Sequence, residues 1–247
     1  MWGVALAGET TRAPGPVEIN WAALLAELEP SAYRRFRLAF DRVAGLLILL
    51  VVSPLILAIA LAIVLDSGGP VFFLQRRAGR FARPFLMVKF RTMSTRAPEF
   101  SLKVAPDDPC ITRVGRFLRA SGMDELPNLW NVVRGEMALI GPRPEQFALL
   151  GYYKSRQHLR HLVKPGLTGW WQIHHRDSEP MHLNVDKDIY YILNQSLALD
   201  LRIIVGTMKV AASAFARRRH RKETAERGQT ITRPDLAATA DGSGRVD

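Results

Sequence analysis

The sequence has very little cysteine, since Cys110 is the only one among its 247 residues. An intramolecular disulfide and a metal site built from several cysteines are therefore excluded, which suits a reducing compartment. The sequence also lacks internal repeats and the signatures of helix-turn-helix, zinc-binding and RNA-binding modules. We therefore expect no nucleic-acid partner, and we assign the net charge of +11 to other anionic partners, namely phosphates and lipid headgroups.

Charged side chains are absent from one long stretch, residues 43–65. As an α-helix this stretch would be about 35 Å long at roughly 1.5 Å per residue, enough for a hydrocarbon core of roughly 30 Å. A buried helix of a soluble protein is the alternative, but the stretch has no polar face. Because it begins at Val43 and no small-residue cleavage site follows it, we expect a membrane helix and not a signal peptide.

Basic residues flank this stretch on both sides. Short basic flanks stay on the cytoplasmic side, so a simple crossing would place one of them on the wrong face of the membrane. The flanking residues are Arg34, Arg35, Arg37 and Arg42 before the stretch, and Arg76, Arg77, Arg80, Arg83, Lys89 and Arg91 after it. The charges therefore favour a helix that enters the membrane and turns back.

Pro54, preceded by Ser53, lies near the middle of the stretch. Each half would be about 16–18 Å long, which reaches only the midplane of a bilayer. Proline has no N–H and leaves the carbonyl of Leu50 without its helical partner, so the helix must at least kink. The Ser53 hydroxyl can replace part of the lost bonding. A re-entrant helix–break–helix and a proline-kinked single span both fit these residues.

The chain divides into four parts. They are an N-terminal extension (1–33), a basic collar with the membrane helix (34–66), a compact cytoplasmic domain (67–216) and a basic, then polar, disordered tail (217–247). We predict an α+β fold that is mainly helical, in which a re-entrant membrane helix is joined to a small domain with a short β-hairpin and surface amphipathic helices.

Local patterns place the elements of this domain. Residues 71–75 and 85–90 predict two strands around a glycine-containing loop. Residues 111–120 predict a helix, and residues 186–215 predict two helices with apolar stripes. The residues of the stripe are Leu197, Leu201, Ile204 and Met208. Before the membrane stretch, Asn20 is suited to cap a short amphipathic helix over residues 21–30.

Residues 121–145, SGMDELPNLWNVVRGEMALIGPRPE, hold the strongest candidates for chemistry. Pro127 is tolerated only in the first turn of a helix, which puts the helix start near Asp124 and its end at Gly135. The spacing predicts an apolar face made of Leu126, Leu129, Trp130 and Val133. Asp124 and Glu125 would then lie in the first turn, where free N–H groups stabilise negative charge. An ionised carboxylate there can act as a nucleophile or bind a divalent cation, although an ordinary capping pair is the alternative.

Cationic side chains surround this acidic pair in the sequence. Arg119 precedes it, Arg143 follows it between two prolines, and Lys89 belongs to the second predicted strand. Arginine is suited to bidentate recognition of phosphate. Cations on either side of an acidic pair are the arrangement that a metal–diphosphate site requires, because they offset the charge of phosphate oxygens. Solvated or lipid-facing surface charge is the alternative for each of them.

Five long segments occur in the order LAFDRVAGLLILLVVSPLILAIALAIVLDSGGPVFFLQRRAGR, KFRTM, DDPCITRVGRFLRASGMDELPNLWNVVRGEMALIGPRPE, VKPGLTGWWQ and YYILNQSLALDLRII. Together they resemble the bacterial sugar transferase family, the monotopic polyprenol-phosphate phosphoglycosyl transferases. The resemblance covers roughly residues 34–210, and long colinear motifs are far more specific than one short pattern.

The resemblance implies a topology and a reaction. The Ser53-Pro54 pair matches the break of a re-entrant helix with both ends in the cytoplasm, at the bacterial cytoplasmic (inner) membrane, with the catalytic domain on its cytoplasmic face. The reaction moves a sugar 1-phosphate from a UDP-sugar to a polyprenyl (undecaprenyl) phosphate, releases UMP and primes the synthesis of a cell-surface polysaccharide or glycoconjugate. The resemblance leaves the sugar, the pathway and the formation of a homo-oligomer open.

The resemblance also implies residue roles. Asp124 would attack the sugar-bearing phosphate to form a covalent aspartyl phosphosugar, and it would bind Mg²⁺ (or Mn²⁺). Glu125 would position or deprotonate the acceptor. The residues implied in substrate binding are Lys89, Arg119, Arg143 and Arg176.

The sequence departs from the family pattern after GW. The family reads GWAQ followed by a hydrophobic residue and NGR, whereas this chain reads GWWQIHHR, with Trp171, His174 and His175 in place of small or amide residues. Cys110 stands where the family often has arginine. A membrane-anchored scaffold with an inert transferase domain is the competing interpretation, and the intact pair Asp124 and Glu125 argues against it.

Overall fold

The computed structural model describes residues 5–6, 19–26, 28, 32–95, 97, 105, 108–175, 185–210 and 212–213. The predicted tail (217–247), Arg176 and most of the N-terminal extension lie outside these residues. The described fold is mainly helical with two small sheets, which confirms the predicted class. The boundaries assigned to the four parts of the chain stay predictions.

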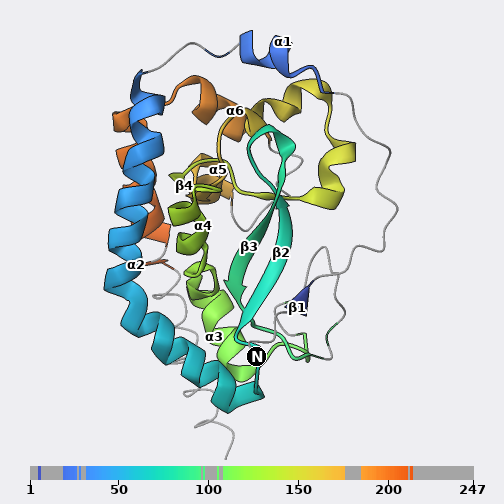
Figure 1. The fold of residues 1–247 in the computed structure, drawn as a ribbon, viewed down its shortest axis with the longest axis vertical. Helices are drawn as coiled ribbons and strands as arrows, with labels where there is room; N and C mark the ends of the chain where they lie inside the picture. Colours follow the sequence, from blue (N-terminus) through green and yellow to red (C-terminus); the bar gives the residue numbers. More distant parts are fainter. Residues whose placement is uncertain are drawn as a thin grey trace, which may run out of the picture.

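Helix α2 (Ala32–Ser67) contains the whole uncharged stretch, with Pro54 inside it. The Ser53 hydroxyl donates a hydrogen bond to the Leu50 carbonyl at 2.8 Å, the replacement expected from the sequence. The structure has one helix that continues through Pro54, where that bond offsets the missing N–H of proline, and not two helices separated by a break. Figure 1 shows that this helix is bent along its length. How α2 lies in a membrane stays a prediction.

The two sides of α2 have different surroundings. The part Arg35–Ser67 is long and apolar enough to span a membrane. On its outer side Val51 is 80% and Leu65 78% exposed, whereas Ile59 and Ile63 are buried against Val71, Phe90 and Leu118. Leaving apolar surface in water costs about 25 cal/mol per Å². The outer side of α2 is therefore suited to lipid, and the inner side belongs to the core.

Helix α2 also lies against helix α4 (Asn128–Arg134), as Figure 1 shows. A Cβ atom added at Gly45 would stand 2.8 Å from Cγ1 of the fully buried Val132, closer than carbon atoms approach one another. Glycine at position 45 therefore permits the close contact that fixes α4, and with it the acidic pair just before α4, against the membrane helix.

Strands β2 (Phe72–Ala78) and β3 (Pro84–Phe90) form the predicted antiparallel hairpin, with Phe72 opposite Phe90 and Ala78 opposite Pro84. Strand β5 (Glu145–Gln146) pairs antiparallel with β2, and the short strand β1 (Ala5–Leu6) pairs parallel with it. A second sheet pairs β4 (Ala138–Ile140) with β6 (Gly166–Thr168) in parallel. The pairing of β2 with β5 brings the hairpin beside the GPRP segment, residues 141–144.

Short helices complete the described fold. Helix α1 (Trp21–Ala26) begins as predicted, since Asn20 Oδ1 accepts a hydrogen bond from the Ala23 amide at 3.0 Å. The others are α3 (Arg113–Ser121), α5 (Trp170–His175), α6 (Val185–Leu193), a helix over residues 197–210, and the 3₁₀ helices η1 (Arg80–Ala82), η2 (Met123–Glu125), η3 (Phe147–Tyr152) and η4 (Ser155–Leu162).

The apolar stripe predicted for the helix over residues 197–210 does not face the core. Its members Leu197, Leu201, Ile204 and Met208 are all exposed. Leu199 and Ile203, on another side of the same helix, are buried against Tyr191 and Ile192 of α6. The helix therefore carries two apolar faces, and only the face outside the predicted stripe holds it in the fold.

Candidate active site

The acidic pair lies in a tight turn between two helices. Helix α3 ends at Gly122, which adopts a left-handed conformation with φ 75°, and Asp124 and Glu125 follow in η2. Pro127 caps α4, which begins at Asn128, so the predicted helix start near Asp124 is wrong by one turn. The reason is local, since Gly122 turns the chain and Pro127 fits equally well just before a helix, where its missing N–H has no partner to lose.

The predicted apolar face of α4 is also only partly correct. Leu129 is buried, but Trp130 is 49% exposed and the polar Asn131 is buried in its place. The Asn131 side chain supplies the hydrogen bonds that two main-chain groups of β3 would otherwise make to water. Its Oδ1 accepts from the Val88 amide at 3.0 Å, and its Nδ2 donates to the Leu86 carbonyl at 2.7 Å. An unmet buried backbone group costs about 1–3 kcal/mol, so these bonds tie β3 to the helix that follows the acidic pair.

Glu125 is held by two cations from distant parts of the chain. Its Oε1 lies 2.9 Å from Lys89 Nζ on β3 and 2.6 Å from Arg143 Nη2, and its Oε2 accepts a second bond from Arg143 Nη1 at 3.3 Å. The side chains of Lys89 and Glu125 are only 12% and 14% exposed, so solvent screens these charges weakly. The structure thus brings together three of the predicted site residues.

The two cations decide the charge state of Glu125. Burial alone would raise the pKa of its carboxyl, but Arg143 and Lys89 outweigh burial and hold this pKa well below its usual range. Burial also disfavours the charged form of Lys89 and therefore lowers its pKa, whereas the charge of Glu125 raises it. Glu125 therefore stays ionised and is a weak base.

Asp124 differs from its neighbour. Among the described residues it takes part in no hydrogen bond or ion pair, and it is half-buried. Burial first, and then the charge of Glu125, raise the pKa of its carboxyl, while Lys89, Arg143 and Arg119 act against this rise. The pair is thus divided between one carboxylate engaged by cations and one carboxyl whose oxygens are open to a ligand.

Arg119 lies in the last turn of α3, and its charge acts on Asp124. Its Nη1 is buried without a hydrogen-bond partner in the part of the chain that the structure describes. A buried donor without a partner costs free energy, so this nitrogen is a candidate to bind a ligand oxygen. The remaining predicted ligand, Arg176, lies outside the described residues.

The donor set around Asp124 can be compared with the needs of a divalent cation. The described residues contain no group of three or more His, Cys, Asp or Glu side chains that could enclose a metal by themselves. Mg²⁺ is commonly bound through one or two carboxylates together with substrate phosphates. A single open carboxyl beside phosphate-binding cations fits that mode of binding.

Arg77, on β2, is a site residue that the sequence analysis missed. Arg77 stands opposite Phe85 and Lys89 stands opposite Phe73, so Arg77 and Lys89 point to the same face of the hairpin. Burial, and then the nearby charge of Arg143, lower the pKa of Arg77 to about 10. The sequence could have indicated this residue, because side chains alternate between the two faces along residues 75–78 (QRRA) of β2. The alternation puts Gln75 and Arg77, but not Arg76, on the face of Lys89.

A family model for bacterial sugar transferases matches residues 32–214. The chain belongs to the bacterial sugar transferase family. The residues matched include α2, the hairpin, the acidic pair and the GPRP segment, so the model covers the candidate site described above.

Several curated relatives carry more specific names. The chain is 38% identical over 202 residues to the UDP-N-acetylgalactosamine-undecaprenyl-phosphate N-acetylgalactosaminephosphotransferase of Aeromonas hydrophila, a match covering 78% of this chain and 48% of the relative. It is 38% identical over 188 residues to the uncharacterized sugar transferase EpsL of Bacillus subtilis (strain 168), covering 76% and 93%. It is 40% identical over 184 residues to the UDP-glucose:undecaprenyl-phosphate glucose-1-phosphate transferase of Escherichia coli (strain K12), covering 71% and 40%. The chain thus spans about half of the first relative and less of the third.

Proposed function

We propose that this chain transfers a sugar 1-phosphate from a UDP-sugar to a polyprenyl phosphate through a covalent intermediate on Asp124. One observation carries the proposal: Asp124 is open and unpaired among the described residues, while Glu125 beside it is held by Lys89 and Arg143. The names of the relatives support the donor and the acceptor, since two of them state a UDP-sugar and undecaprenyl phosphate.

In the first step an Asp124 oxygen attacks the phosphorus that bears the sugar. A new P–O bond forms to the carboxylate, the bond to the bridging oxygen of the diphosphate breaks, and UMP leaves with that electron pair. Asp124 must be ionised to attack, and its raised pKa gives it more basicity than an ordinary aspartate, and with it more nucleophilicity. When bound, Mg²⁺ would offset the charge of the diphosphate oxygens, with Asp124 among its ligands.

In the second step a phosphate oxygen of the polyprenyl carrier attacks the same phosphorus, and the Asp124 carboxylate leaves. The product is a polyprenyl diphosphate sugar, and the free carboxylate is restored. Because each substrate reacts in turn at one carboxylate, the route predicts ping-pong kinetics.

Glu125 acts in this scheme by position more than by proton transfer. Its low pKa makes it a poor base, whereas its Oε1 fixes both Lys89, at 2.9 Å, and Arg143, at 2.6 Å. Arginine and lysine held in this way stand ready to stabilise the negative charge of phosphate oxygens without being reorganised during the reaction. The resemblance implies that Glu125 positions or deprotonates the acceptor; the geometry argues against deprotonation and supports a positioning role that acts through Lys89 and Arg143.

The membrane helix explains how a water-soluble donor and a lipid-embedded acceptor can reach the same site. The donor is water-soluble and the acceptor is embedded in lipid, so the site must stand at the membrane surface. The exposed apolar side of α2 and its basic flanks supply the contacts that hold a domain at that surface. We assign the domain to the cytoplasmic face of the bacterial inner membrane.

The purified full chain in detergent should release UMP from a UDP-sugar in the presence of Mg²⁺ and a short polyprenyl phosphate. A screen of UDP-sugars, with UMP measured for each, identifies the donor and tests the function together. Absence of UMP release with every donor would favour the membrane-anchored scaffold with an inert domain. Product analysis should show the sugar phosphate on the polyprenyl carrier.

The topology of α2 can be tested with single cysteines. In a Cys110→Ser background, Arg35→Cys and Arg83→Cys place one thiol at each basic flank, and both positions are exposed. If α2 is re-entrant, a membrane-impermeant maleimide should label neither thiol in intact cells and both in inverted vesicles. Labelling of one thiol from outside would establish a full crossing. Pro54→Leu, which restores the N–H, should shift the labelling towards that crossing pattern.

A further inference from the structure

The GPRP segment is held at its start by main-chain hydrogen bonds, from Gly141 N to the Thr168 carbonyl and from Gly166 N to the Pro142 carbonyl, both at 2.8 Å, and around Arg143 by arginine side chains. Here the Arg143 loop denotes residues 141–144, in which Pro142 and Pro144 have no N–H for pairing. The Ile140 carbonyl, just before the loop, accepts a hydrogen bond from Arg37 Nη2 at 2.7 Å. The Arg143 carbonyl accepts from Arg160 Nη2 at 2.8 Å, and the Pro144 carbonyl accepts from Arg77 Nη1 at 3.2 Å. Three arginines from α2, η4 and β2 thus bind three carbonyls around Arg143.

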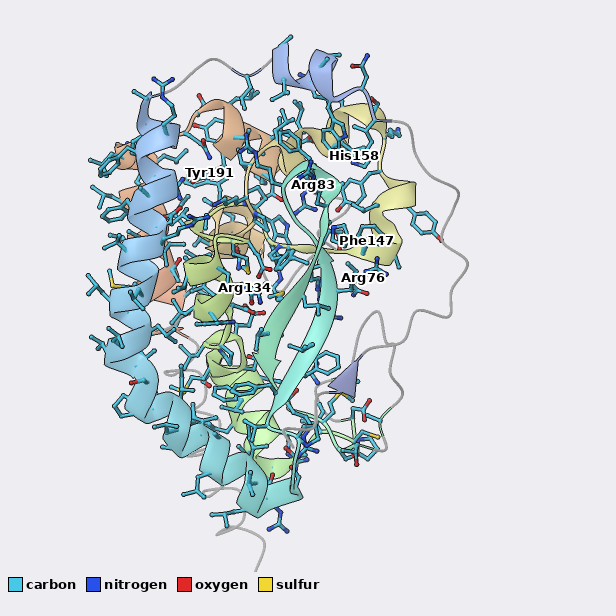
Figure 2. The ribbon with its side chains drawn as sticks, viewed as in Figure 1. Arg76, Arg83, Arg134, Phe147, His158 and Tyr191 are labelled. Atoms are coloured by element: carbon cyan, nitrogen blue, oxygen red, sulfur yellow. The ribbon has the colours of Figure 1, made fainter. Side chains whose placement is uncertain are left out.

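Two of these arginines are committed to buried partners. Arg160 is 1% exposed in its side chain, and its Nη2 lies 2.7 Å from Asp188 Oδ2 on α6. Arg37 is buried and lies 3.2 Å from Asp200 of the helix over residues 197–210. Arg37 Nη1 also donates to the Tyr191 hydroxyl at 2.6 Å, and Figure 2 shows Tyr191 on the side of α6 that faces α2. Their charges are therefore balanced inside the fold and are not offered to a substrate.

Arg77 is anchored in a different way. Its Nε and Nη2 both donate to Gln75 Oε1, at 3.1 and 2.6 Å, which fixes the plane of the guanidinium so that Nη1 meets the Pro144 carbonyl. This arrangement uses three donors of one rigid fork at the same time. A lysine has the charge but cannot hold two such partners in one plane.

We propose that Arg37, Arg77 and Arg160, here called the arginine clamp, are positioning residues that fix the main chain on both sides of Arg143 and thereby set the direction of its guanidinium. The proposal rests on the proposed function, in which the Arg143 guanidinium binds substrate phosphate. Arg143 reaches Glu125 through two bonds, and this bidentate geometry tolerates little movement of the backbone that carries it.

Arg77 is the member of the clamp that is best suited to a test. It is half-buried, and replacing it leaves no buried ion-pair partner of the kind that Asp188 is for Arg160. Arg77→Lys keeps the charge near Glu125 and Arg143 but loses the fork. Arg76→Lys is the matched control, because Arg76 is the next residue on the same strand, so its side chain points to the opposite face from Arg77, with its guanidinium over the Phe147 ring at 5.0 Å (Figure 2).

The first measurement is a double-mutant cycle in UMP release. Arg77→Lys should lower kcat at least about tenfold while KM for the UDP-sugar changes less than about threefold, and Arg76→Lys should stay within about twofold of wild type. In an Arg143→Lys background, Arg77→Lys should cost less than about threefold more, because the clamp acts through Arg143. Equal costs in both backgrounds would overturn the proposal, since Arg77 would then act independently of Arg143. An unchanged kcat in the single variant would overturn it too.

The second measurement does not depend on activity. Hydrogen–deuterium exchange of the full chain should show faster exchange at the amides of Gly141, Arg143, Glu145 and Gln146 in Arg77→Lys than in wild type, and no change in Arg76→Lys. Arg160→Lys, which keeps a cation beside Asp188, should show the same local effect. If wild type releases no UMP, the proposed function fails, but this exchange still tests the clamp. Unchanged exchange in both clamp variants would overturn the positioning role.

Discussion

Asp124→Asn should leave a folded protein that releases almost no UMP. Asparagine keeps the size of the side chain and suits a turn as well as aspartate does, so η2 and the start of α4 should persist. The amide has no anionic oxygen to attack phosphorus and is a poor ligand for Mg²⁺, so turnover should fall by at least about a thousandfold. Asp186→Asn, at an exposed position in the first turn of α6, is the matched control and should be near wild type.

The intermediate itself can be observed by mass. Wild type incubated with a UDP-sugar and Mg²⁺ but without acceptor should gain the mass of one phosphosugar, located on Asp124, with one UMP released per chain. Asp124→Asn should gain nothing. Retained turnover in Asp124→Asn would reject the assignment of the nucleophile. If wild type forms no adduct and UMP appears only when both substrates are bound, the sugar phosphate passes directly from donor to acceptor.

The elements that could be predicted from the sequence are those set by local patterns. The hairpin of β2 and β3 follows from two apolar runs around a glycine-containing loop, and α1 follows from Asn20 as its cap. Gly135 ends α4 as expected, because the helix closes with a left-handed residue, φ 78°, that glycine adopts without strain. In each case the deciding residues are close together in the chain.

The errors arose where contacts between distant segments decide the outcome. Asn131 is polar, yet it is buried because Leu86 and Val88 of β3 complete its hydrogen bonds. No period along α4 reveals this, so the predicted face included the exposed Trp130 in its place. Helix α2 is the contrasting case, because Pro54 and the Ser53 bond to the Leu50 carbonyl are local features that the sequence analysis expected.

The candidate site shows the same division. Asp124 and Glu125 could be singled out from their turn, and Arg143 from its two prolines, but their unequal environments depend on the fold. Lys89 reaches Glu125 because β3 lies beside η2, and this contact leaves Asp124 as the open member of the pair. Sequence patterns therefore identified the residues, whereas only the packing distinguished their roles.

Glu125→Gln should slow turnover strongly without preventing formation of the intermediate. A glutamine oxygen can accept a bond from Lys89 or Arg143 but carries no charge, and its amide nitrogen would oppose the other cation. Both cations would lose their common anchor, so steady-state turnover should fall by at least about a hundredfold. Asp124 keeps its carboxylate, so the phosphosugar adduct should still form when donor and Mg²⁺ are supplied without acceptor.

The pH dependence of adduct formation tests Glu125→Gln a second time, because the structure predicts the direction in which the pH profile moves. The negative charge of Glu125 raises the pKa of Asp124, so removing that charge should lower this pKa. Because Asp124 attacks only when ionised, the acidic limb of single-turnover adduct formation should move to lower pH in Glu125→Gln. Glu136→Gln is the matched control, since Glu136 accepts a hydrogen bond from Asn131 outside the site and glutamine can accept it too, so its acidic limb should not move. An acidic limb that stays in place or moves to higher pH in Glu125→Gln would show that the two carboxyl groups do not interact as the structure indicates.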